Sequence, residues 1–254
     1  MVKLRAMHSS KIKICNAFGI PVYLDFSLII LLILFATNGG SFTLSISCAL
    51  MLLVSITAHE LGHALTARAF GYGTRDITLS LLGGCASLIA LPRKAWQEFL
   101  TAIAGPAVSF ALAALAFLVL LFIPVDEWTH YLLSYAVGMN VILGAFNLLP
   151  GFPMDGGRVF RSLMRAFMSR ARATYIAMIV GRGVAILLGL WGLHRIVNGT
   201  GWGFVTILIA WMIWREGYRE YQMACMEERA RDWSARVSPP PYGGDDDEVE
   251  IRED

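Results

Sequence analysis

Two histidines and a glutamate stand together in the segment HELGH, residues 59 to 63. His59 and His63 are four positions apart, so on a helix their side chains project from one face, one turn above the other. This spacing allows two imidazoles to bind one zinc ion, and Glu60 is placed beside them to act on water at the metal. The pattern therefore predicts a catalytic metal site with Glu60 as its acid/base.

The sequence around this motif, "ITAHELGHALTA", is otherwise fit for the interior of a membrane. Each ionisable group placed in a membrane span costs on the order of 2 to 3 kcal/mol even on lenient insertion scales. Three such groups on one helical turn need compensation, and metal coordination supplies it. Histidines that only pack and hydrogen-bond are the alternative interpretation, which this cost disfavours.

A third metal ligand is expected because catalytic zinc takes three protein ligands and keeps one position open. His8 precedes the first apolar run, and His130 and His194 fall toward the opposite face of the membrane. The candidate is Asp155, in a segment whose helix breaks at prolines and glycines, "NLLPGFPMDGGR". Broken backbone at membrane depth is tolerated where it is buried in protein or lines a wet cavity. We expect Asp155 to reach the histidines; an ordinary Asp-Gly turn is the alternative.

The composition predicts a polytopic membrane protein as the scaffold for these groups. Hydrophobic residues make up 56% of the 254 residues and charged residues 16%, with a mean hydropathy of +0.59; an ordinary soluble domain carries roughly a quarter charged residues. A spanning helix needs about 20 apolar residues. Apolar runs that meet or approach this length cover residues 22–37, 43–66, 99–123, 131–149, 174–196 and 202–214. We expect an all-α fold with about six transmembrane helices.

Lysine and arginine are concentrated before the first run, in every second connection between runs and after the last run. This distribution predicts that both termini are cytoplasmic. Arg68, the first charge after the second run, follows His63 and His59 by five to nine residues, or roughly 8 to 14 Å of helix. The metal site is therefore expected near the cytoplasmic face of a cell inner (plasma) membrane. Because the net charge of +2 reflects this topology, it does not imply nucleic-acid binding.

The connection between the second and third runs, "RDITLSLLGGCASLIALP", residues 75–92, alternates in part and is split by Gly83 and Gly84. This pattern predicts a short membrane-associated β-hairpin on the cytoplasmic side. A hairpin edge can bind an extended peptide, which makes both glycines candidate substrate contacts. Capping of the helix bundle is the alternative role.

The chain is expected to consist of a membrane-embedded domain, residues 1–220, and a charged cytoplasmic tail, residues 221–254. Within the tail, "EERARDWSAR" can continue as a helix, and the acidic run "DDDEVEIRED" is expected to be disordered.

Three motifs in order, "HELGHA", "IAGPAVSFA" and "NLLPGFPMDGGR", resemble the site-2 protease family of intramembrane zinc metalloproteases. The segments "GIPVYLDFSLII" and "LLGGCASL" are similar to those of its compact prokaryotic members. The resemblance covers roughly residues 18–165. It implies one zinc ion held by His59, His63 and Asp155, with Glu60 as the catalytic acid/base.

The same resemblance implies that Asn147 lies near the active site and helps to hold substrate; Asn140, which opens the segment leading to the second motif, is a further candidate substrate contact. The expected activity is hydrolysis of peptide bonds in or near the transmembrane segment of membrane-tethered regulatory proteins. The PDZ and cystathionine-synthase-type domains that the family often carries are not recognisable in this sequence. Control of access is then expected from the membrane domain, from a regulatory protein partner or from a part of the protein outside this sequence.

Two other classes of membrane protein use histidines within helices. A di-iron desaturase needs several histidine boxes, which the five histidines of this chain do not provide. A metal transporter with the same His/Asp site is the serious alternative. Glu60, which transport does not require beside the two histidines, favours hydrolysis.

Overall fold

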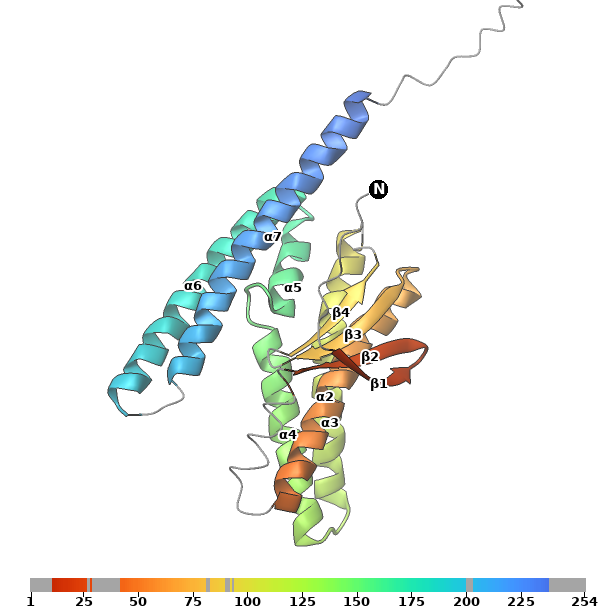
Figure 1. Ribbon diagram of the computed structural model, residues 1–254, viewed down its shortest axis with the longest axis vertical. Coiled ribbons are helices and arrows are strands. Elements are labelled where there is room, and N and C mark those ends of the chain that lie inside the picture. The colour runs from red at the N-terminus through yellow and green to blue at the C-terminus, as the bar shows by residue number, and fades with distance from the viewer. Residues whose placement is uncertain are drawn as a thin grey trace, which may run out of the picture.

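The computed structural model describes residues 11–26, 28, 42–80, 83–89, 92, 94–199 and 203–237. Helices make up most of this part of the chain, together with one small sheet (Figure 1). In chain order the elements are β1 (Lys11–Ala17), β2 (Ile20–Asp25), α2 (Phe42–Ala69), β3 (Thr74–Ser80), β4 (Gly83–Leu88), α3 (Ala95–Phe122), α4 (Glu127–Asn147), α5 (Asp155–Met164), α6 (Arg170–Val197) and α7 (Gly203–Val237).

Three of the described helices, α2, α3 and α6, are long and apolar enough to cross a membrane, with 28 residues each. They contain most of the predicted runs 43–66, 99–123 and 174–196, while α4 and α7 contain most of the remaining two runs after residue 130. The prediction that the first span begins at residue 22 is wrong, because Ile20–Asp25 is a strand. Most of that run lies outside the described residues.

Helices α2, α3 and α4 pack into one bundle, and α6 and α7 form an antiparallel pair. The short helix α5 contacts both α3 and α6, and Figure 1 shows it between the bundle and the pair. Close approach of α2 and α3 depends on small residues: a Cβ on Gly62 would lie 2.8 Å from the carbonyl oxygen of Ala104. Small residues at such crossings let helix backbones approach where lipid offers no hydrophobic driving force.

The sheet has the order β1-β2-β3-β4, with antiparallel outer pairs and a parallel pair of β2 with β3. Its hairpin β3–β4 confirms the strands predicted for residues 75–92, although β1 and β2 were not predicted. Strands β3 and β4 contact α2, and side chains from the sheet and α2 share one buried apolar core that includes Val22, Ile56 and Ile77. The sheet therefore lies directly against the helix that carries the histidines.

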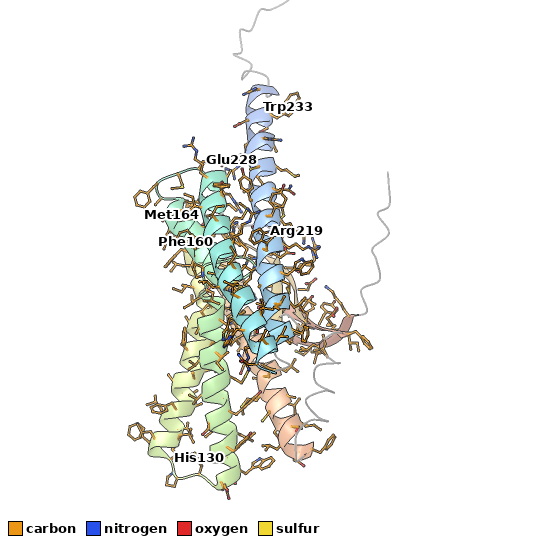
Figure 2. The ribbon with its side chains drawn as sticks, turned by 90° about the vertical axis from the view of Figure 1, so that its left-hand side faces the viewer. His130, Phe160, Met164, Arg219, Glu228 and Trp233 are labelled. Carbon is orange, nitrogen blue, oxygen red and sulfur yellow. The ribbon has the colours of Figure 1, made fainter. Side chains whose placement is uncertain are left out.

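Helix α7 runs unbroken to Val237, so "EERARDWSAR" is helical as predicted. The expected division at residue 220 falls inside this helix, and the acidic run lies outside the described residues. Figure 2 shows Trp233, near the end of α7, at one end of the molecule and His130, at the start of α4, at the other. The charged end of α7 and the α3–α4 connection therefore lie at opposite ends of the long axis of the molecule.

Candidate metal centre

Helix α2 presents His59 and His63 on one face, and both side chains are buried. Their ring centroids lie 4.9 Å apart in an edge-to-face arrangement, and their Nε2 atoms are 3.3 Å apart. The helical repeat predicted from the sequence therefore brings the two Nε2 nitrogens to one point.

Asp155, the first residue of α5, completes this point from a distant part of the chain. Its Oδ2 atom lies 3.1 Å from the Nε2 atoms of both His59 and His63, and the ligand atoms of the three residues all lie within 4.8 Å of one another. Gly156 allows this placement, since a Cβ there would lie 2.3 Å from the carbonyl oxygens of Leu148 and Leu149. The turn between α4 and α5 can thus close tightly enough to deliver the carboxylate.

The charge state of Asp155 suits a metal ligand. Burial alone would raise the pKa of its carboxyl group. However, His63 and His59, which lie within hydrogen-bonding distance, and the positive charge of Arg158 hold this pKa well below its usual range. The group is therefore ionised at neutral pH, which is the form that binds a cation.

Helix α3 orients both imidazole rings through contacts with their Nδ1 atoms. Nδ1 of His63 lies 2.7 Å from the carbonyl oxygen of Thr101, and Nδ1 of His59 lies 2.9 Å from the hydroxyl of Ser109. A carbonyl oxygen only accepts, so Nδ1 of His63 donates, and Nε2 offers a lone pair to a metal once it has released its proton. Metal-binding histidines are typically held in this way, and the site therefore fits a metal bound through two Nε2 atoms and one carboxylate.

Space for the rings depends on Gly105, between Thr101 and Ser109 on α3. A Cβ at this position would lie 2.2 Å from Nε2 of His63 and 2.7 Å from Nε2 of His59. Gly105 and Ser109 lie in the segment "IAGPAVSFA", which was interpreted only through its family resemblance, and no role was predicted for Thr101, Gly105 or Ser109. Their spacing of four, which places them on one face of α3, is the signal that could have identified them.

Glu60 is buried beside the histidines on α2 and is held by the sheet. Its Oε2 atom accepts a hydrogen bond of 2.9 Å from the backbone N–H of Ala86 on β4. A Cβ on Gly84 would lie 2.2 Å from Cγ of Glu60, so only glycine lets β4 approach this closely. Gly84 thus contacts the predicted acid/base itself, while Gly83 pairs with Ser80 at the end of the hairpin.

The two candidate asparagines on α4 form hydrogen bonds to protein groups. The side-chain amide of Asn147 donates to the carbonyl oxygen of Leu143 at 3.0 Å. Asn140 is 2% exposed and donates to the hydroxyl of Ser55, one turn before His59, at 2.9 Å. Its Oδ1 atom has no hydrogen-bond partner among the described residues. The substrate-binding role of both asparagines stays a prediction.

Comparison with known proteins matches this centre to a family. The sequence profile of Peptidase family M50 matches residues 47–132 and 125–190, a stretch that contains His59, His63 and Asp155. The chain belongs to Peptidase family M50. The resemblance to site-2 proteases read from the motifs is thereby confirmed, and with its apolar helices the chain is a multi-pass membrane protein.

Individual M50 relatives support the assignment. The chain is 34% identical over 251 residues to a protein of Synechocystis sp. assigned as a zinc metalloprotease, covering 92% of this chain and 65% of that relative. It is 33% identical over 186 residues to a zinc metalloprotease of Methanocaldococcus jannaschii, covering 72% of this chain and 54% of the relative. The chain thus spans between about half and two thirds of the length of these curated relatives.

A solved structure shares the fold. The site-2 protease from Methanocaldococcus jannaschii superposes with a TM-score of 0.62 at 28% sequence identity. The match covers 83% of this chain and 95% of that one.

Proposed function

We propose that this M50 chain is a zinc-dependent intramembrane endopeptidase. The observation that carries the proposal is the convergence of His59, His63 and Asp155 at one buried point, with Glu60 on the same turn of α2. Two imidazoles and one carboxylate form a donor set found in catalytic zinc sites, which keep one further position open. Family membership supports this function over the transporter alternative.

The residues would hold a single zinc ion through the Nε2 atoms of His59 and His63 and the carboxylate of Asp155. When bound, zinc acts as a Lewis acid that polarises the scissile carbonyl group. Thr101 and Ser109 keep the two rings in the orientation that this binding needs.

Glu60 moves the protons of the reaction. Its carboxylate takes a proton from water as the water oxygen bonds to the scissile carbonyl carbon, and it returns a proton to the nitrogen as the C–N bond breaks. The N–H of Ala86, which bonds to Oε2 of Glu60 at 2.9 Å, fixes the carboxylate for both transfers. Net hydrolysis consumes one water and yields a carboxylic acid and an amine.

The free edge of β4 is the proposed site for extended substrate. Ala86 directs its N–H away from β3, toward Glu60, and alternate residues of a strand direct their backbone groups to the same edge. Gly84 therefore shares this edge, and a peptide added along it lies beside Glu60. Because a helix occupies its carbonyl groups in internal hydrogen bonds, a transmembrane substrate must unwind before attack.

Gly83, Asn140 and Asn147 are proposed as further substrate contacts. Asn147 is supported by the family resemblance, although its amide would have to release the carbonyl of Leu143. Replacing Ala86 by proline removes the edge N–H that bonds Oε2 of Glu60, so this variant tests the placement of Glu60 and substrate binding along β4 together. Unchanged proteolysis of this variant would contradict substrate binding along β4.

We further propose that the chain crosses the inner membrane of a cell about six times and that both termini lie in the cytoplasm. The metal site is proposed to lie near the cytoplasmic face of this membrane. Gly151, four residues before Asp155, lies against Gly181 of α6 and Ile213 of α7. The first charge of α7 is Arg215, directly beyond this level. The site is therefore level with the point where α7 becomes polar, which supports a location close to the membrane–water boundary.

From the family resemblance, the proposed substrate is a membrane-tethered regulatory protein, with access controlled by the membrane domain, residues 1–220, or by a protein partner. The segment 221–254 is proposed as a cytoplasmic tail.

The test compares the wild-type chain with Glu60→Gln in detergent, measuring zinc content and cleavage of a single-span model substrate. About one zinc in both proteins, with cleavage by the wild type only, supports the proposal. Zinc in both without cleavage of any of a panel of substrates, together with zinc flux into liposomes, would favour the transporter.

A further inference from the structure

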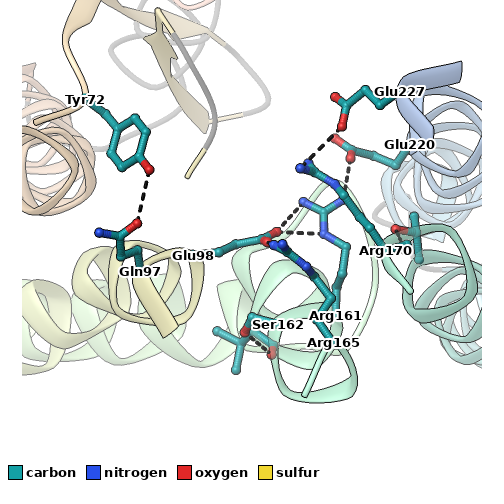
Figure 3. A network of polar contacts seen from close by, with 11 residues as sticks. Tyr72, Gln97, Glu98, Arg161, Ser162, Arg165, Arg170, Glu220 and Glu227 are labelled. Atoms are coloured by element: carbon teal, nitrogen blue, oxygen red, sulfur yellow. Dashed lines mark hydrogen bonds and ion pairs between the residues drawn. The ribbon is translucent and has the colours of Figure 1, made fainter. Parts of the chain in front are cut away.

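One buried arginine connects three helices next to the metal centre. Arg161 on α5 is 2% exposed. Its Nε donates to Glu98 of α3 at 2.7 Å, and one of its terminal nitrogens donates to Glu220 of α7 at 2.8 Å. Figure 3 shows the guanidinium between the two carboxylates. The planar, multi-donor guanidinium is suited to hold two such partners at fixed angles.

Further ion pairs surround Arg161 and involve the same helices. Arg165, directly after the last residue of α5, also pairs with Glu98. Arg170, at the start of α6, lies 3.3 Å from Glu227 of α7 (Figure 3). The charged half of α7 is thus attached to α5 and α6 by side chains that compensate one another's burial, as buried charges require.

Arg161 also contacts the turn that delivers Asp155. Its guanidinium carbon lies 4.9 Å from the ring centroid of Phe152, in a cation–π contact. Phe152 is fully buried and precedes Asp155 by three residues. A shift of Arg161 would therefore move the packing surface on which the turn before Asp155 rests.

The same arginine reaches the helix that orients His63. Glu98 lies one turn before Thr101 on α3, and the carbonyl of Thr101 binds Nδ1 of His63 at 2.7 Å. Arg161 is thus connected to both kinds of ligand by separate contacts. Its contact with Phe152 leads to the carboxylate ligand, and its contact with Glu98 leads to a histidine ligand.

We propose that Arg161 is a positioning residue for the metal centre, and that its ion pair with Glu220 makes zinc affinity depend on the charged half of α7. The inference rests on the proposed function, since it takes His59, His63 and Asp155 as the zinc ligands. Loss of Glu220 leaves Arg161 with one carboxylate partner of the two and loosens α5 against α7. The bound state, which needs Asp155 in register with both histidines, weakens as a result.

The test measures the zinc dissociation constant of the detergent-purified full chain by competition with a chelator of known affinity. Glu220→Gln keeps the size of the side chain and removes its charge. Loss of supporting partners outside a metal's ligands typically costs 10- to 100-fold in affinity, and we expect about 10-fold for this variant and for Arg161→Lys.

The matched control is Glu216→Gln, one turn earlier on α7. It removes the same charge from a carboxylate whose partner, Arg219 on the same helix at 3.6 Å, is mostly exposed, and surface pairs of this kind contribute little. We expect zinc affinity within about 2-fold of the wild type. Thermal unfolding of the zinc-free proteins accompanies each titration, and similar midpoints show that a change in affinity does not come from misfolding.

Wild-type affinity in Glu220→Gln overturns the inference and leaves the proposed zinc site intact. Equal weakening in Glu216→Gln also overturns it, because the effect would then follow from the total charge of α7. A wild-type chain that binds no zinc would instead refute the proposed function.

Discussion

The hydroxyl of Ser109 lies 2.9 Å from Nδ1 of His59, so a residue on α3 holds a ring that α2 carries. We predict that Ser109→Ala weakens zinc binding by about 10-fold, since it leaves Nδ1 buried without this partner and frees the ring to rotate. Competition with a chelator measures the change.

The control for this prediction is Thr57→Val. The hydroxyl of Thr57 donates to the carbonyl of Leu53 within α2 at 2.7 Å, and its removal should leave zinc affinity unchanged. Equal affinity in Ser109→Ala and the wild type would show that the hydroxyl does not orient His59.

Gly105→Ala should abolish stoichiometric zinc binding. The added methyl group would lie 2.2 Å and 2.7 Å from the Nε2 atoms of His63 and His59, inside van der Waals contact with both proposed ligands. Elemental analysis of the purified variant measures the loss. Gly138→Ala on α4 is the control, because a Cβ there meets no atom within 4 Å; alanine should stabilise that helix by about 0.5–1 kcal/mol. Full zinc occupancy in Gly105→Ala would contradict the geometry of the site.

Gly84→Ala should separate turnover from metal binding. Its methyl group would meet Cγ of Glu60 at 2.2 Å and displace the acid/base, while the three proposed ligands keep their positions. We expect kcat to fall by a factor on the order of 100, the lower end of the range attributed to general acid–base catalysis, with about one zinc retained. Parallel measurement of kcat and zinc content decides the matter: an unchanged kcat would mean that the contact with β4 does not hold Glu60 in its working position.

Removal of zinc should lower thermal stability reversibly. A ligand that binds only the folded state at 100 times its dissociation constant stabilises it by about 2.7 kcal/mol. The unfolding midpoint of chelator-treated protein should therefore rise when zinc is restored. Asp155→Asn, which weakens the proposed site, should show a smaller rise at the same zinc concentration. An identical rise in both proteins would place the stabilising zinc elsewhere.

The parts of the site that depend on local pattern could be predicted from the sequence. His59 and His63 follow from helical spacing, and Asp155 from a broken helix at the same membrane boundary. Thr101 contributes only a backbone carbonyl and Gly105 only the absence of a side chain, so their residue types do not indicate these roles and only their spacing of four does.

Long-range pairing limited the prediction of the fold. The segment "KIKICNA" alternates in its first residues, but its lysines were interpreted only as topology signals. The parallel register of Val22 with Ile77 joins segments that no local pattern connects. The contact of Arg161 with Glu98 and Glu220 likewise depends on tertiary packing between three helices.

The unbroken course of α7 has a mechanical consequence. Its 35 residues make a rod of roughly 50 Å at about 1.5 Å per residue, longer than the hydrocarbon core of about 30 Å. Glu220, where the rod is fastened to Arg161, lies 13 residues before Trp233, or roughly 20 Å along the axis. A sideways force on the far end of α7 therefore exerts a torque about Glu220. This residue lies beside the turn that carries Asp155.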